Sequence, residues 1–155
     1  MSPPAAPRPA RPAHLTWGYL GLVAAGGSVG TALRALLVSA IPPLGHVPVA
    51  TAGINLLGAF LLGVLLESLV RRGPDVGRRR AMRLLLGTGV LGGFTTYSAL
   101  ATDTVLLLAR DTLGVALLYA LGTVVVGAAA TWAGIALVAG LHRRRGARAQ
   151  GGVGA

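Results

Sequence analysis

The third long apolar segment of the chain contains residues that disfavour a continuous helix. Gly92-Gly93 is followed by the β-branched residues Thr95 and Thr96, and both residue types lower helix propensity. Where a helix breaks inside a bilayer, the released backbone carbonyls must find partners, and such carbonyls can coordinate a cation such as Na⁺. The simpler alternative is close helix packing, because Gly89 and Gly93 have the GxxxG spacing. Taken alone, the segment favours packing.

Polar side chains in the other apolar segments offer hydrogen-bond donors. Asn55 lies in the middle of the second segment, and Thr51 lies one turn earlier on the same helix face. Because an unpaired amide in hydrocarbon is costly, Asn55 either bonds across a helix interface or lines a wet path, where it can donate to a passing anion. Tyr119 and Thr123 form a similar polar stripe on the fourth segment.

Hydroxyl groups also extend along the third segment. They belong to Thr95, Thr96, Ser98 and Thr102. Hydroxyls in membrane helices often bond only to their own helix backbone, which is the simpler interpretation of these side chains.

Two charged residues lie within reach of the membrane. Arg34 is inside the first apolar segment or near its outer end, where it either serves a function or extends its guanidinium to the interface. Asp103 lies roughly two turns beyond the Gly-Gly break, where it can pair with an arginine or face a water-filled vestibule.

The sequence contains no catalytic constellation. The three histidines, His14, His46 and His142, are scattered outside the apolar segments, and there is no paired carboxylate. The chain has no cysteine, which excludes thiol chemistry and thiolate metal sites. We therefore expect no enzymatic activity.

Four apolar segments must position these residues. They span about residues 15–40, 49–70, 82–109 and 113–141, and about 20 apolar residues suffice to cross a bilayer. Apolar residues make up 54% of the chain, and the mean hydropathy is +0.71. We expect an all-α membrane protein with four transmembrane helices, the third of them broken. One membrane domain (14–141) would lie between disordered tails at residues 1–13 and 142–155.

The basic residues predict how the chain crosses the membrane. All of them are arginine, and twelve fall in the two tails and the second loop, against one, Arg110, on the opposite side. The positive-inside rule then places both termini in the cytoplasm, in a single orientation. Arginines that flank apolar segments also argue against nucleic acid as a partner. We expect a multi-pass protein of the bacterial inner (plasma) membrane.

Three motifs together resemble one protein family. They cover residues 26–34, 51–63 and 87–98, and with four segments in this order the chain resembles the CrcB/Fluc fluoride channels from about Tyr19 to Gly140. The resemblance implies an antiparallel dimer in the lipid bilayer, with two pores at the subunit interface. It also implies passive export of fluoride and a structural Na⁺ that is not transported.

The resemblance also implies roles for individual residues. The Na⁺ would be held by backbone carbonyls of Gly92 and Thr95, while Arg34 and Asp103 would lie near the vestibule. The anion path would comprise Asn55, Thr51, Thr96, Tyr97, Ser98, Leu100, Tyr119 and Thr123. Fluoride is tightly hydrated and must be offered hydrogen-bond donors in place of water.

Two features depart from the family pattern. Tyr97 and Leu100 occupy positions where the family has two phenylalanines, whose positively polarised ring edges can face an anion. Leu100 loses that edge. In addition, homodimers that insert in both orientations need balanced charges, which this chain lacks. We expect a homo- or heterodimer, and an alternative is a non-conducting partner subunit of a heterodimeric channel.

Two other classes of membrane protein share part of this pattern. A small multidrug transporter also has four helices, but it needs a membrane-embedded glutamate in the first helix, where this chain has Arg34. A helix-bundle scaffold would use Asn55 and the Gly-Gly break for packing alone.

Overall fold

The fold is built from four helices that are long and apolar enough to cross a membrane. The computed structural model describes residues 16–151, with side chains as far as Arg144. The four spans are α1 (Trp17–Ala40), α2 (Val49–Val70), the segmented third helix (Arg78–Leu108) and the membrane part of α6 (Leu113–Arg144). The expected all-α membrane fold is confirmed.

The structure describes more of the C-terminal tail than of the N-terminal tail. The expected tail at residues 1–13 lies outside the described residues. The fourth helix was expected to end near Leu141, but α6 runs from Leu113 to Gly151. The residues after Leu141 are mainly arginine, alanine and glycine with no proline, and arginine and alanine are good helix formers.

The third helix is broken, as expected. It consists of α3 (Arg78–Met82), a π-helical segment η2 (Arg83–Leu91), α4 (Gly92–Phe94) and α5 (Tyr97–Leu108). Thr95 and Thr96 have extended backbones, with ψ angles of 155° and 117°. The π-helical segment has no counterpart in the sequence prediction.

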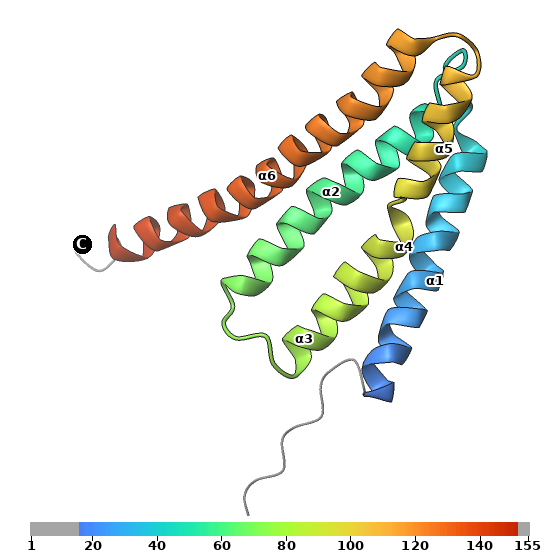
Figure 1. Cartoon of the computed structure of the whole chain (residues 1–155). Coiled ribbons are helices and arrows are strands. Elements are labelled where there is room, and N and C mark those ends of the chain that lie inside the picture. The colour runs from blue at the N-terminus through green and yellow to red at the C-terminus, as the bar shows by residue number, and fades with distance from the viewer. Residues whose placement is uncertain (1–15, 152–155) are drawn as a thin grey trace, which may run out of the picture.

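The helices form two neighbouring pairs that meet at the break. Helix α2 packs mainly against α6, whereas α1 packs against η2 and α4. Figure 1 shows that the start of α1, the α2–α3 loop and the end of α6 lie at one end of the bundle. We call this the arginine end, because residues 71–83 and 143–144 place eight arginines there. The α1–α2 and α5–α6 loops lie at the other end.

Glycines allow the helix backbones to touch. A Cβ atom at Gly26 would collide with the Leu85 carbonyl, and one at Gly30 would collide with the Val90 carbonyl. On the other pair of helices, a Cβ at Gly63 would strike the backbone of Thr131. A Cβ at Gly89 or Gly93 would likewise meet the backbone of α1, so this GxxxG pair packs closely, which explains how α1 lies directly against the third helix.

Candidate functional site: a groove at the helix break

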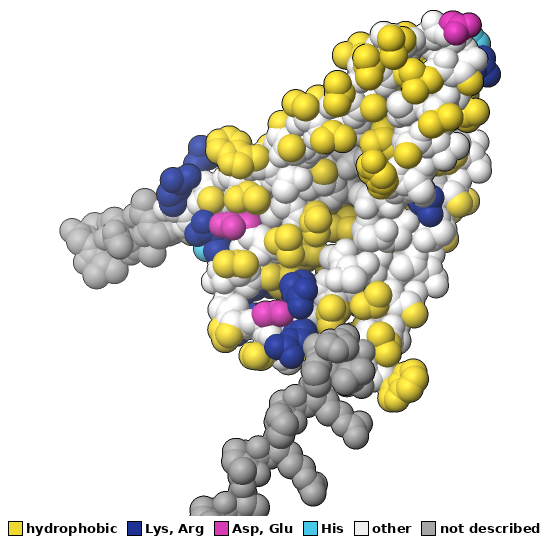
Figure 2. Space-filling view, viewed as in Figure 1, with side chains coloured by type: hydrophobic (Ala, Val, Ile, Leu, Met, Phe, Trp, Pro, Cys, Tyr) yellow, Lys and Arg dark blue, Asp and Glu magenta, His cyan; other side chains and the backbone are white. Residues whose placement is uncertain are grey.

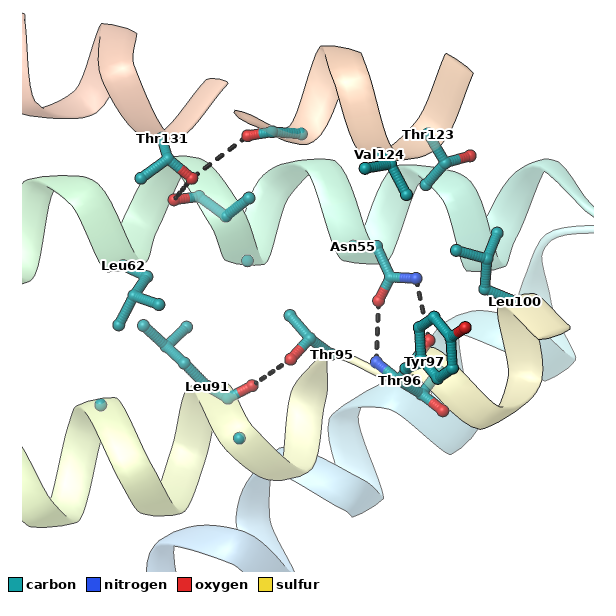
Figure 3. A pocket seen from close by; sticks show the side chains of 15 residues that line it. Asn55, Leu62, Leu91, Thr95, Thr96, Tyr97, Leu100, Thr123, Val124 and Thr131 are labelled. Carbon is teal, nitrogen blue, oxygen red and sulfur yellow. Dashed lines mark hydrogen bonds between the residues drawn. The ribbon is translucent and has the colours of Figure 1, made fainter. Parts of the chain in front are cut away.

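A groove opens beside the break of the third helix. It has a volume of about 370 Å³ and lies between α2, α6 and the residues on both sides of the break. Seven of the residues predicted for the ion sites line it: Asn55, Gly92, Thr95, Thr96, Tyr97, Leu100 and Thr123. Figure 3 shows the side chains that come from α2, α6 and the broken helix, namely those of Asn55, Thr123, Thr95, Thr96, Tyr97 and Leu100. The fold thus gathers into one place residues from three separate spans.

Asn55 bonds reciprocally to the backbone of the break. Its Nδ2 donates to the Thr96 carbonyl at 3.0 Å, and its Oδ1 accepts from the Thr96 N–H at 2.8 Å (Figure 3). The amide therefore satisfies a donor and an acceptor that the extended backbone removes from the helical ladder. A side-chain amide carries two N–H donors, and one remains for another partner in the groove.

The hydroxyls near the break divide into two groups. Thr95 and Thr123 donate to carbonyls four residues earlier in their own chain segments, Leu91 O at 2.9 Å and Tyr119 O at 2.6 Å. The simpler interpretation of membrane hydroxyls thus holds for these two. Thr96 Oγ1 instead accepts from Ala99 N at 3.2 Å and caps α5, a favourable arrangement at a helix N-terminus.

A second set of bonds holds the break from the side of α1. Arg34 Nε donates to the Gly93 carbonyl at 3.1 Å, and Thr31 Oγ1 donates to the same oxygen at 3.5 Å. Arg34 is half-buried, so its guanidinium supports the backbone at the break. Gly93 also lies tightly against Gly27. The two glycines therefore differ, because Gly93 packs on α1 while Gly92 lines the groove.

The bonds that hold the break do not use the carbonyls of Gly92 and Thr95. The bonded carbonyls are those of Leu91, Gly93 and Thr96. Gly92 and Thr95 both line the groove. Backbone oxygens without a partner suit a hard cation better than an anion. Within residues 16–144, no cluster of three metal-ligating His, Cys, Asp or Glu side chains is present.

The two positions that depart from the family pattern face different surroundings. Tyr97 is 79% exposed and points outward from the subunit, whereas Leu100 is only 6% exposed. Leu100 belongs to a buried cluster with Leu107, Ala116 and Tyr119, although it also borders the groove. Its side chain is thus occupied mainly in packing α5 on α6.

The other predicted residues lie outside the groove. Tyr119 Oη donates to Asp103 Oδ2 at 3.0 Å and so joins α6 to α5. Asp103 therefore has a tyrosine as its partner rather than an arginine. Thr51 is buried on α2, and Ser98 is exposed, with its hydroxyl 3.1 Å from that of Thr96. These side chains and Arg34 are not among the groove-lining residues.

Comparisons with known proteins decide the family. The model of the family described as CrcB-like protein, Camphor Resistance (CrcB), matches residues 21–135. The chain belongs to the CrcB family. It is 55% identical over 138 residues to the fluoride-specific ion channel FluC 2 of Leifsonia xyli subsp. xyli. The aligned residues cover 89% of this chain and 95% of that protein.

More distant members of the CrcB family carry similar names. The fluoride-specific ion channel FluC 1 of Cutibacterium acnes is 47% identical over 77% of this chain and 84% of its own. The fluoride-specific ion channel FluC of Novosphingobium aromaticivorans is 43% identical over 77% of this chain and 94% of its own. The family resemblance is confirmed, and these relatives are named as channels, not as enzymes.

Sequence reasoning missed several residues that shape the site of this CrcB-family chain. Thr131 Oγ1 lies 3.2 Å from the Ala59 carbonyl and 3.1 Å from that of Gly127, and so joins α6 to α2 at the groove. Gly58 leaves room for the Thr95 side chain. The only signal in the sequence was the number of small residues on α2 and α6, which did not identify their partners.

Proposed function

We propose that the chain is a subunit of a passive fluoride-selective channel that lowers cytoplasmic fluoride. The observation that carries the proposal is the groove at the break, which Asn55 lines while its amide keeps one N–H donor. Donors in a narrow, largely apolar groove can replace part of the hydration shell of a small anion. The names of relatives at 43–55% identity support fluoride as that anion.

A second subunit would complete the path. The groove is open on one side in a single chain, and Tyr97 beside it is 79% exposed. An antiparallel dimer would cover this opening and place two broken helices against each other. The exposed side chain of Val124, which lines the groove, is compatible with either lipid or a partner chain.

A structural Na⁺ fits the backbone at the break. The carbonyls of Gly92 and Thr95 take no part in the bonds that hold the break, and hard cations prefer such oxygens. When bound, the ion would supply a fixed positive charge and cross-link the two subunits. In this proposal Asn55 and Arg34 hold the backbone that presents these oxygens.

The cytoplasmic location of both termini is also a proposal. It rests on the gathering of basic side chains at the arginine end of the bundle, which Figure 2 shows, and on the preference of such residues for the cytoplasmic side. The same asymmetry supports insertion in one orientation into the inner membrane.

A non-conducting role in a heterodimer is the second candidate. Leu100 is buried in the α5–α6 core and offers no aromatic edge to an anion. In a heterodimer, a homologous subunit inserted the opposite way would supply the aromatic side chains that this chain lacks.

Fluoride efflux from liposomes tests both candidates. The chain is reconstituted alone, and then together with a CrcB-family subunit whose arginines have the opposite distribution. Efflux from the chain alone supports a self-sufficient channel, and efflux only from the mixture supports the heterodimer. If neither preparation releases fluoride faster than protein-free vesicles, both candidates are wrong and the scaffold interpretation replaces them.

A further inference from the structure

A second cavity lies at the arginine end, beneath the loop between α2 and α3. Its volume is about 170 Å³, and it is lined by Leu66, Leu69, Val70, Gly73, Asp75, Arg79 and Arg83. The apolar side chains come from the last turns of α2, and the two guanidinium groups come from the start of the third helix. A cavity with an apolar wall and a cationic rim fits a molecule that is both apolar and anionic.

The carboxylate in this cavity is already engaged. Asp75 Oδ2 accepts from Arg83 Nε at 3.0 Å and lies 2.9 Å from Arg83 Nη2. Arg80 donates its Nε to the Asp75 carbonyl at 3.0 Å. Asp75 therefore compensates the charge of Arg83 and, at a longer distance, that of Arg80, and it leaves Arg79 uncompensated.

Arg79 is held at the cavity with donors to spare. It is half-buried, and in the described part of the chain its side chain forms one hydrogen bond, from Nη1 to the Pro74 carbonyl at 3.3 Å. Within residues 16–144 it has no carboxylate partner. Its Nε and Nη2 can therefore donate to an anion, and guanidinium groups are well suited to phosphate.

The backbone of the loop is shaped around this guanidinium. Gly73 has a φ of 109°, which side-chain-bearing residues rarely adopt, and a Cβ atom there would collide with Arg79 Nη1. The glycine thus permits the guanidinium to lie directly against the loop at the cavity rim.

Apolar side chains stay exposed next to these cations. Val70 is 72% exposed and Leu66 is 39% exposed, at the end of a membrane span. Figure 2 shows hydrophobic and basic side chains side by side at this end of the molecule. A free phosphate ion would need the cations alone, whereas a phospholipid would also use the apolar wall.

We propose that this cavity binds an anionic phospholipid. Its phosphate accepts hydrogen bonds from Arg79, and its glycerol and upper acyl carbons lie against Leu66 and Val70. Basic pockets at the membrane surface of transmembrane proteins recognise such headgroups by this combination of charge and apolar contact. The inference does not depend on fluoride conduction.

Native mass spectrometry of the purified full chain tests the proposal. Phosphatidylglycerol is titrated against the wild type, Arg79→Gln and Arg79→Lys, with phosphatidylcholine as the zwitterionic comparison. We expect wild type to prefer phosphatidylglycerol and Arg79→Gln to bind it roughly five-fold more weakly, since one basic residue near the surface contributes about 1 kcal/mol. Arg79→Lys retains the charge and should fall between the two.

Arg110→Gln is the matched control, because it removes one arginine at the opposite end, where Nη1 lies 3.0 Å from His46 Nδ1. It should bind phosphatidylglycerol as wild type does. Three results would overturn the proposal: equal binding of the two lipids, no effect of Arg79→Gln, or an equal loss in Arg110→Gln. Displacement of phosphatidylglycerol by millimolar inorganic phosphate would also overturn it, in favour of a free-anion site.

Discussion

At the scale of single residues, Asn55 does more than its sequence position indicates. Its amide forms two bonds to Thr96, so it holds the extended backbone at the break and at the same time lines the groove. Of the two interpretations left open by the sequence, the structure confirms the bond across a helix interface, and the water-filled path remains part of the proposed function. Substitutions must be chosen to separate these roles.

The substitutions Asn55→Asp and Asn55→Ala separate the role of the amide in holding the break from its role in the anion path. Alanine leaves the N–H and carbonyl of Thr96 without partners, each at a cost of about 1–3 kcal/mol, so we expect lower thermal stability together with lost efflux. Aspartate keeps an acceptor for the Thr96 N–H but removes the donors and adds a negative charge. We expect it to assemble and yet to lose most fluoride efflux.

Size-exclusion chromatography, thermal melting and liposome efflux are the three measurements. An Asn55→Asp protein that assembles and conducts as wild type does would contradict a role for the amide donors in the anion path.

The ion pair of Asp75 should make the stability of the α2–α3 loop depend on pH. A hydrogen bond from Arg83 holds the pKa of this carboxyl below its ordinary value of 3.8. Because the pKa is lowered in the folded chain, the ion pair contributes stability above pH 3.8 and loses it as the pH falls through the lowered pKa. Asp75 is exposed and Arg83 is half-buried, so solvent screens the ion pair and the effect is confined to the loop.

Hydrogen exchange of residues 71–83 measures this effect. Protection should fall on acidification below pH 3.8 in wild type, and Asp75→Asn should show the weaker protection already at neutral pH. The same pH dependence in both proteins would assign it to another group.

At the scale of elements, α1 and the third helix act as one packed pair. The carbonyls of Leu85 and Val90 face Gly26 and Gly30 so closely that no Cβ fits. This contact, together with the bond from Arg34 to Gly93, fixes where the third helix breaks relative to the rest of the bundle.

Gly30→Ala tests this packing. Alanine has the higher helix propensity, but its Cβ would collide with the Val90 carbonyl, and such overpacking costs about 1–3 kcal/mol. We expect a lower melting temperature in detergent. Gly21→Ala on the same helix has nothing within 4 Å of its Cβ, so it should melt at or above the wild-type temperature. Equal melting temperatures of Gly30→Ala and Gly21→Ala would contradict close packing at Gly30.

The elements that were predictable from sequence are those set by local chemistry. The four apolar segments predicted the spans, and the low helix propensity of residues 92–96 indicated the break, although that segment taken alone favoured packing. The partner of Asn55 was not predictable, because it lies 41 residues away. The burial of Leu100 and the π-helical segment before the break also depend on how neighbouring helices pack, which no local pattern encodes.

At the scale of the whole molecule, charge asymmetry is the dominant feature. The arginine end contains the α2–α3 loop and the end of α6, while Arg110 at the other end lies against His46. A subunit with this distribution should insert in one orientation, which bears directly on whether it can pair with a second copy of itself in antiparallel fashion.

Cysteine labelling measures the orientation, since the chain has no cysteine of its own. Leu44→Cys is in the α1–α2 loop and Val76→Cys is in the α2–α3 loop, and the two native side chains are 75% and 57% exposed. An impermeant maleimide added to intact cells should label only Leu44→Cys, and Val76→Cys should react after lysis. Comparable labelling of both in intact cells would indicate dual insertion and favour a homodimer.

The reciprocal bond between Asn55 and Thr96 also has a consequence for biosynthesis. Thr96 lies 41 positions after Asn55 in the chain, so α2 emerges from the ribosome before the break of the third helix does. During that interval Asn55 has no Thr96 to bond, and a lone amide is poorly tolerated in lipid. The nascent α2 would therefore remain beside the insertion machinery until the third helix arrives, so that the two enter the lipid together.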